Sequence, residues 1–418
     1  MNDIRPTLDA RPLDTRLDKL AEVAVRVGLG LAHGQELVVT APLDAVPLVR
    51  RITEHAYKAG ASLVTTILAD EHATLSRFRH APDDAFDTAP AWLFEGMAAA
   101  YRGGAARLAV AGDNPALLAK EDPDKVARAN KARSVAYRPA MELITSFDIN
   151  WAIVSYASPA WAHQVFPDLP EDEAVARLWD AIFAASRIDA PDPVAAWAAH
   201  NAELHARTAR LNEQRFDALH FTGPGTNLRV GLSDGHLWLG GSEPAKNGIT
   251  CNPNIPSEEV FTTPHRAKVE GHVRATKPLS YGGTLIKDIA VTFEAGRITQ
   301  AQASTGLDVL EKVLGTDDGA RRLGEVALVP NSSPISQGGL LFFNTLFDEN
   351  AASHIALGQA YRTCLEGGTT AGESELERRG ANTSLIHIDW MIGSGEIDID
   401  GLNTDGTSTP VMRAGEWT

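Results

Sequence analysis

Hydrophobic and polar positions in the first half of the chain alternate between helical and strand periodicity. Apolar residues recur at helical spacing from Leu17 to Val27, and a β-rich run follows over Glu36 to Thr40. The order of helix and strand then repeats, which predicts an α/β domain with a mostly parallel sheet flanked by helices. The predicted helices cover residues 17–27, 44–60, 91–101, 171–187 and 191–211, and the predicted strands cover 36–40, 62–68, 105–111 and 150–156.

The second half of the chain has a different pattern. From Arg215 onward, short alternating strands are separated by turn residues, for example Gly223-Pro224-Gly225 and Glu294-Ala295-Gly296. This pattern is typical of a twisted or barrel-like β domain. We therefore predict two domains, an α/β supporting domain over residues 1–212 and a β-rich domain over residues 213–418.

The glycines near residue 30 raise the question of nucleotide binding. Gly28-Leu29-Gly30 with Gly34 resembles part of a dinucleotide fingerprint. However, this segment closes a helix and precedes a strand, whereas the fingerprint follows a strand and opens a helix. The pattern therefore favours a supporting role for the first domain.

Charge and cysteine content narrow the class of protein further. The 418 residues carry a formal net charge of −16, which argues against nucleic acid or an anionic membrane as partner. The first 16 residues contain no apolar run, so neither a secretory signal nor a membrane anchor is expected. The two cysteines, Cys251 and Cys364, suit a reducing compartment as small buried hydrophobes. These features predict a cytoplasmic protein.

Four fragments of the second domain carry candidate chemistry, and the first covers Leu385 to Ile392. As a strand, it places four apolar side chains on one face and His387 and Asp389 together on the other. An imidazole and a carboxylate on one side of a strand suit a divalent metal such as zinc. A polar pair satisfied by water on a half-solvated strand is an equally good interpretation of this fragment alone.

Two further fragments contribute carboxylates. Glu325 interrupts the apolar strand that runs from Leu323 to Val329, and a buried carboxylate requires a cation or a hydrogen-bond partner. An edge strand with Glu325 facing solvent is the alternative. Glu258 and Glu259 stand side by side in an extended segment, so their side chains face opposite ways and only one is expected at a given centre. An exposed acidic turn is the alternative there.

The fourth fragment runs from Asn344 to Tyr361. His354 and Tyr361 are seven residues apart, which places them on one face if the segment is helical. Glu349 lies off that face and would then come from the incoming loop. A packed or surface histidine is the more common role of such a residue. Together the four fragments supply the residue types of a two-metal hydrolytic centre with carboxylate bridges.

The same fragments closely resemble the thermophilic-type metalloaminopeptidases, the aminopeptidase T and aminopeptidase S family. The resemblance extends to Ala41–Gly60 and so covers nearly the whole chain. Trp390 stands where the family usually has Phe, and His265 where a carboxylate is common. The matching stretches are NIPSEEVFTTP (254–264), RRLGEVALVP (321–330), NTLFDENAASHIALGQAY (344–361) and HIDWMIG (387–393).

The resemblance implies a Rossmann-like N-terminal domain, a barrel-like catalytic domain and a homodimer. It also implies two divalent ions, Zn, Co or Mn, that activate a water for attack on the first peptide bond of short peptides with a free N-terminus. Tyr361 is implied as a catalytic side chain, and Glu325 is our candidate for the bridging carboxylate, with Glu325 or Glu349 as the proton shuttle. The implied metal ligands are Glu259, Glu325, Glu349, His354, His387 and Asp389.

Two other functions compete with this prediction. A different amidase or esterase could use the same two-metal centre, and cleavage of amino-acid amides but not of N-blocked ones would exclude it. A two-domain ligand-binding protein without catalytic activity is the second alternative, and metal analysis would distinguish it. A serine nucleophile is not expected, because no Gly-x-Ser-x-Gly sequence stands at a strand-to-helix elbow in the predicted pattern.

Overall fold

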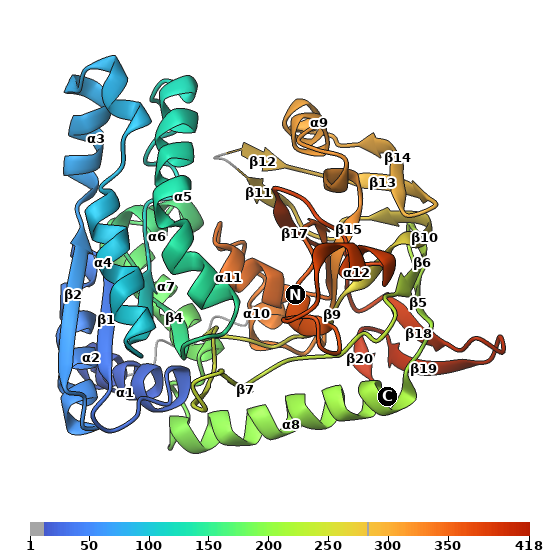
Figure 1. Ribbon diagram of the computed structural model, residues 1–418, viewed down its shortest axis with the longest axis horizontal. Helices are drawn as coiled ribbons and strands as arrows, with labels where there is room; N and C mark the ends of the chain where they lie inside the picture. Colours follow the sequence, from blue (N-terminus) through green and yellow to red (C-terminus); the bar gives the residue numbers. More distant parts are fainter. Residues whose placement is uncertain (1–11, 282–283) are drawn as a thin grey trace. The chain divides into compact units, whose positions relative to one another are not determined.

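The computed structural model describes residues 12–281 and 284–418 (Figure 1). It divides into two compact units, of which the first contains the chain up to Ala199 and Ser242–Pro256, and the second His200–Gly241 and Ser257–Thr418. The predicted boundary at residue 212 lies inside helix α8 (Pro193–Gln214), which continues from one unit into the other. Residues 1–11 lie outside the described residues. The expectation that the chain has no secretory signal rests partly on them.

The first unit is built on a parallel sheet with strand order β2-β1-β3-β4. Consecutive residues of the inner strand β1, Leu37, Val38 and Val39, are all buried, so both faces of the sheet are covered. Val38 packs in one apolar cluster with side chains of α4 and α5. The predicted α/β architecture is therefore present. The strands are β1 (Glu36–Pro42), β2 (Leu63–Ala69), β3 (Ala106–Ala111) and β4 (Trp151–Ser155), and a short pair, β7 (Glu243–Pro244) and β8 (Thr250–Cys251), follows later in the chain.

All the helices predicted for the first half are present, but four further helical segments of the described chain, α3, η3, α5 and α6, are not predicted by periodicity. The longest of these, α5, buries only Ala129, Ala140 and Ile144 and contains Pro139, so its apolar stripe is weak in the sequence. The helices are α1 (Leu13–Val23), η1 (Ala24–Gly28), η2 (Leu43–Ala45), α2 (Val46–Lys58), α3 (Glu71–His80), η3 (Asp83–Asp87), α4 (Ala91–Arg102), α5 (Pro123–Thr145), α6 (Pro159–Val165) and α7 (Glu171–Ala185).

The second unit contains an antiparallel sheet of eight strands in the order β14-β13-β10-β6-β5-β18-β19-β20. The predicted turns at 223–225 and 294–296 join β5 to β6 and β13 to β14. In the described part of the chain, the edge strands β14 and β20 do not pair with each other, so the sheet does not close into the predicted barrel. Its strands are β5 (Ala218–Gly223), β6 (Thr226–Leu232), β10 (Pro264–Arg274), β13 (Ala290–Glu294), β14 (Arg297–Gln302), β18 (Asp398–Leu402), β19 (Ser408–Arg413) and β20 (Glu416–Trp417).

A second antiparallel sheet, with the order β17-β16-β15-β9, packs in the same unit. Val326, Ile355 and Trp390 from this sheet share one hydrophobic core with residues of the eight-stranded sheet. Its strands are β9 (Val260–Thr262), β15 (Leu323–Leu328), β16 (His354–Gly358) and β17 (His387–Met391), and a hairpin pairs β11 (Leu279–Tyr281) with β12 (Thr284–Ile286). The helices of the unit are α9 (Leu307–Leu314), η4 (Gly319–Arg321), α10 (Pro334–Gly338), α11 (Thr345–Asp348), η5 (Glu349–Ala351), η6 (Arg362–Cys364) and α12 (Glu373–Arg378).

Both cysteines are buried, as predicted, and burial raises the pKa of the Cys251 thiol to about 11. A thiol with so high a pKa is almost entirely protonated near neutral pH and therefore a poor nucleophile. Within the described residues, no helix is both long enough and apolar enough to cross a bilayer.

Candidate metal centre

The strand register of the four-stranded sheet brings together candidate ligands that are far apart in the sequence. Alternate residues of each strand face opposite sides, so the core contacts of Val326, Ile355 and Trp390 direct Glu325, His354 and Asp389 to the other face. A register shift between Leu323 and Glu325 places Leu323 in the core and still turns Glu325 away from it. The hydrophobic core thus determines which face carries the polar residues.

Small residues stand opposite most of the candidate ligands on this face, although Met391 also pairs with His354. Ala356 of the central strand β16 lies between Glu325 of β15 and Asp389 of β17. Gly358 pairs with His387, and Ala327 pairs with His354. Because directly opposed side chains are neighbours, these small partners leave space in front of the sheet for the ligand groups to converge. The central position of β15 between β16 and β9 also excludes the alternative of a solvent-facing edge strand for Glu325.

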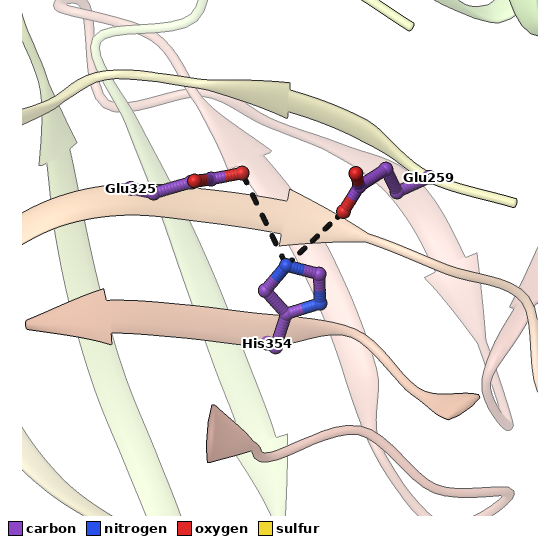
Figure 2. Close-up of side chains that lie close together, drawn as sticks. All are labelled: Glu259, Glu325 and His354. Atoms are coloured by element: carbon purple, nitrogen blue, oxygen red, sulfur yellow. Dashed lines mark ion pairs between the residues drawn. The ribbon is translucent and has the colours of Figure 1, made fainter. Parts of the chain in front are cut away.

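Five of the side chains form two overlapping groups, each with ligand atoms within 4.8 Å of one another. In the first, His354 Nε2 lies 3.1 Å from Glu259 Oε2 and 4.0 Å from Glu325 Oε1 (Figure 2). In the second, His387 Nε2 lies 3.1 Å from Glu325 Oε2 and 3.3 Å from Asp389 Oδ1. The two oxygens of Glu325 therefore face different histidines, and Glu325 belongs to both groups.

Glu258 and Glu259 have opposite orientations, as their extended backbone predicts. Glu259 reaches the cluster, whereas Glu258 lies 3.7 Å from the Nε2 atom of His200. Both carboxylates are buried, with exposed fractions of 3% for Glu258 and 7% for Glu259. The alternative of an exposed acidic turn is therefore excluded.

Backbone carbonyls orient both imidazole rings of the cluster. The Nδ1–H group of His354 donates to the carbonyl of Ala352 at 3.2 Å, and that of His387 donates to the carbonyl of Gln359 at 2.7 Å. Each ring therefore turns its Nε2 atom toward the carboxylates. This arrangement is usual for histidines that bind a metal, because the bond at Nδ1 leaves the lone pair of Nε2 available.

The charges of the cluster are poorly balanced without a cation. Burial, together with the charges of Asp389 and Glu259, raises the pKa of Glu325 to about 7, although a hydrogen bond from His387 lowers it. Burial lowers the pKa of His354, but Glu259, Asp389 and Glu325 outweigh it and raise this pKa to about 10. Burial and the neighbouring carboxylates also raise the pKa of Glu349 well above its usual range. The carboxylates thus favour bound protons or other cations.

Two buried carboxylate oxygens indicate where a cation fits. Glu259 Oε2 and Asp389 Oδ1 accept no hydrogen bond within the described residues, and each faces an Nε2 atom at close range. A carboxylate oxygen and an imidazole lone pair repel each other unless a proton or a metal ion lies between them. Mixed nitrogen and oxygen donors of this kind suit first-row divalent ions such as zinc. The residues therefore fit a metal.

Glu349 and Tyr361 lie beside the two groups without being part of either. Glu349 is half-buried in the turn η5 and lines a pocket of about 30 Å³ together with Asp389 and Met391. The ring of Tyr361 packs against that of His387, with centroids 4.7 Å apart, and 42% of the tyrosine surface is exposed. Desolvation of the hydroxyl itself and the carboxylates of Glu325 and Asp389 raise the pKa of the Tyr361 hydroxyl well above its usual range. This hydroxyl is therefore a hydrogen-bond donor near neutral pH.

The predicted helical placement of His354 and Tyr361 is wrong. The chain leaves the turn η5 in an extended conformation at Ala352, and His354 begins the central strand β16. Gly358, with φ of 102°, cannot continue a helix, and pairing with β15 and β17 replaces helical hydrogen bonds. Tertiary pairing thus overrides the local helical spacing. Tyr361 nevertheless reaches the cluster, from the segment that follows the strand.

The comparison with known proteins agrees with this geometry. The sequence from residue 13 to residue 417 matches the family described as thermophilic metalloprotease (M29). The chain belongs to the M29 family. This confirms the predicted family and, with it, the predicted class of enzyme, a metal-dependent hydrolase of peptide bonds.

Several M29 relatives match over nearly their full length. Aminopeptidase T of Thermus thermophilus is 58% identical over 96% of this chain and 98% of its own. Aminopeptidase 2 of Geobacillus stearothermophilus is 46% identical over 97% of this chain and 98% of its own. The solved structure of wild-type AmpT from Thermus thermophilus superposes with a TM-score of 0.93 at 56% identity, and the match covers 97% of this chain and all of that one.

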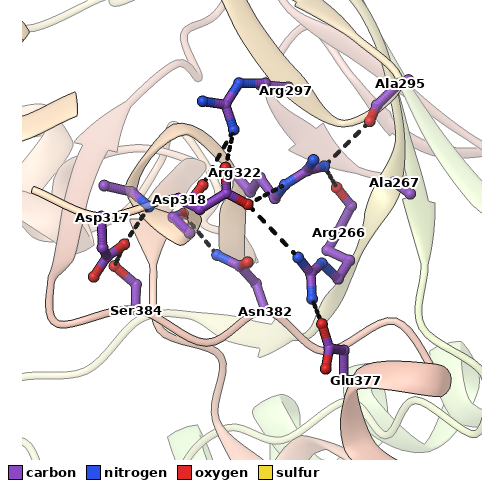
Figure 3. A network of polar contacts seen from close by, with 12 residues as sticks. Arg266, Ala267, Ala295, Arg297, Asp317, Asp318, Arg322, Glu377, Asn382 and Ser384 are labelled. Atoms are coloured by element: carbon purple, nitrogen blue, oxygen red, sulfur yellow. Dashed lines mark hydrogen bonds and ion pairs between the residues drawn. The ribbon is translucent and has the colours of Figure 1, made fainter. Parts of the chain in front are cut away.

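A polar network not predicted from the sequence supports the segment before β17 in this M29 protein. Asp317 accepts hydrogen bonds from the hydroxyl of Ser384 at 2.8 Å and from the N–H group of Leu385 at 2.7 Å (Figure 3). The neighbouring Asp318 lies among three guanidinium groups, those of Arg266, Arg297 and Arg322. The two bonds to Asp317 anchor the residues that lead directly to His387. Lone acidic residues in a turn give no sequence signal for such a role.

We predict that Asp317→Asn destabilises the protein near neutral pH by about 1 kcal/mol, because an amide offers one acceptor oxygen in place of two. Burial raises the pKa of Asp317, but the bonds from Leu385, Ser384 and Ala320 lower it overall. The carboxylate therefore stabilises the fold above roughly pH 4, and this contribution is lost as the pH falls through the lowered pKa. Urea unfolding at several pH values should show the variant and the wild type converging in acid. A constant difference, or an equal loss in the exposed control Asp308→Asn, would contradict the prediction.

Proposed function

We propose that the protein is a metal-dependent aminopeptidase that removes N-terminal residues from short peptides. The observation that carries the proposal is the buried carboxylate of Glu325, whose two oxygens face the Nε2 atoms of His354 and His387. A carboxylate shared between two three-residue groups suits a pair of metal ions. The aminopeptidase relatives give the expected reaction.

The proposed centre holds two divalent ions. Glu259, Glu325 and His354 would bind one ion, and Glu325, His387 and Asp389 the other. Glu349, whose pKa is raised by burial and by the nearby charges of Glu259 and Asp389, would add a further carboxylate. The four carboxylates carry four negative charges when ionised, which two divalent cations neutralise. Zn, Co and Mn all accept this mixture of nitrogen and oxygen donors.

When bound, the two ions supply an activated water and polarise the scissile carbonyl. The surrounding residues of the chain perform the other tasks. A glutamate of the site, Glu325 or Glu349, would accept a proton from the nucleophile and pass it to the leaving amine. The hydroxyl of Tyr361 would donate a hydrogen bond to the oxyanion that develops on the substrate.

The acidic pocket beside the cluster supports selection of a free N-terminus. Glu349 and Asp389 line it together with apolar side chains such as Leu279 and Met391. Specificity for a free N-terminus follows if a carboxylate of this pocket or a bound ion captures the amine of the substrate, which a blocked peptide does not present. We further propose that the protein acts as a homodimer in the cytoplasm, as the family resemblance and the cysteine usage imply.

Metal removal tests the proposed function directly. We expect the purified protein to contain about two divalent ions per chain and to hydrolyse an amino-acid anilide. Dialysis against a chelator should abolish hydrolysis, and zinc, cobalt or manganese should restore it. The N-acetylated anilide serves as the control and should not be cleaved. Full activity after the metal has been removed, or equal cleavage of the blocked compound, would reject the proposal.

Glu325→Gln tests the shared carboxylate. The amide keeps the shape of the side chain but loses the charge and one acceptor oxygen, so we expect kcat/KM for the anilide to fall by at least about 1,000-fold. Circular dichroism should show an unchanged fold. The exposed Glu294→Gln on β13 is the matched control and should retain activity. Normal turnover by Glu325→Gln would remove Glu325 from the mechanism.

Tyr361→Phe removes one hydroxyl while the aromatic contact with His387 remains. We expect kcat to fall by about 100-fold with little change in KM, because the hydroxyl acts in the transition state. Metal content, measured alongside, should stay at the wild-type value. A rise in KM alone would mean that Tyr361 binds substrate and does not stabilise the oxyanion.

A further inference from the structure

Glu259 differs from the other four members of the two metal-binding groups in how its backbone is held. Glu325, His354, His387 and Asp389 all lie within paired strands. Glu259 comes directly before β9, whose first paired residue is Val260. A ligand outside the strand ladder needs another fixed contact to hold its backbone in place.

We propose that Asn350 is this contact, and that its side chain positions Glu259 for metal binding. The Oδ1 atom of Asn350 accepts the N–H group of Glu258 at 2.7 Å, one residue before Glu259. The inference rests on the proposed metal centre and adds a residue that the family resemblance does not assign. Asn350 touches no reacting group in this proposal, and it acts only through the backbone that carries Glu259.

The surroundings of Asn350 make it a rigid anchor. Its side chain is fully buried, and its Nδ2 group donates to the carbonyl of Leu346 at 3.0 Å. Its own carbonyl accepts the hydroxyl of Ser333 at 3.1 Å. With both ends of the amide bonded, the side chain cannot rotate without breaking a buried hydrogen bond. The backbone of Glu258, and with it that of Glu259, is thereby held in place.

Asn350 also connects two candidate ligand segments. It follows Glu349 directly and precedes His354 by four residues. Its hydrogen bond to Glu258 spans 92 residues of sequence and so reaches the segment that carries Glu259. Loss of the bond would therefore disturb the group formed by Glu259, Glu325 and His354. The group formed by Glu325, His387 and Asp389 has no member that depends on Asn350. The proposal thus predicts an unequal effect on the two ions.

The experiment measures metal binding of purified Asn350→Ala without relying on activity. The chelated protein is titrated with zinc or cobalt, and the ions retained after gel filtration are counted. We expect about two ions per chain in the wild type and about one in the variant, with the affinity for the lost ion weakened by roughly 10- to 100-fold. With cobalt, the visible absorption of the remaining site should be unchanged.

Two control variants separate positioning from a general loss of stability. Asn212 makes the same kind of paired bonds, with both ends of its amide on the backbone of Trp238, so Asn212→Ala should destabilise the fold and retain both ions. Ser333→Ala removes the hydrogen bond to the backbone carbonyl of Asn350. The side chain of Asn350 keeps its hydrogen bond with the N–H group of Glu258 in this variant. Ser333→Ala should also bind two ions with normal affinity.

Two outcomes would overturn the inference. Asn350→Ala could retain two ions with the affinity of Asn212→Ala, or it could lose both equally. If Asn350→Ala does not fold, Asn350→Ser replaces it, since a serine hydroxyl is too short to reach Glu258. Hydrogen exchange of the wild-type Glu258 amide gives an independent test, because rapid exchange would mean that the bond is absent. If the wild type itself binds no divalent ion, the proposed function fails instead.

Discussion

Three carboxylates and two imidazoles meet in one largely buried cluster, with the carboxylate of Glu349 beside it, and the electrostatic cost of this arrangement governs the surrounding structure. Burial raises the pKa of Glu325 to about 7, while the carboxylates raise that of His354 to about 10. Groups of the same charge at such distances need a compensating cation. The proposed pair of metal ions would provide it, and the proposed hydrolytic chemistry would use the same pair. The stability of the cluster and the proposed function therefore depend on the same interaction, that between the buried carboxylates and the cations.

The four-stranded sheet makes this cluster possible because it separates two tasks on its two faces. Ile355 and Trp390 pack into the core that both antiparallel sheets share, while His354 and Asp389, their direct neighbours in sequence, face the cluster. A one-residue slip of register would exchange the two faces. Each apolar contact in the core therefore also fixes the direction of a candidate ligand.

Contacts outside the cluster hold the candidate ligands in place. Carbonyl groups of Ala352 and Gln359 orient the two imidazole rings, and Asp317 anchors the segment before His387. Asn350 plays the same part for Glu259, because its side chain accepts a hydrogen bond from the preceding residue, Glu258. Most of these partners are backbone groups or single polar side chains, so a sequence without an alignment gives no sign of them. They become visible only when the chain is folded.

The sequence alone determined the two types of architecture and the strand that carries His387 and Asp389, because strong periodicity reflects local burial. It did not predict α5, most of whose residues are exposed, or the strand conformation of His354. Nor could it choose between Glu258 and Glu259 without the family resemblance. Tertiary structure decided these points, since strand pairing, register and the contact of Asn350 with Glu258 join segments far apart along the chain. Local spacing contains no information about such long-range contacts.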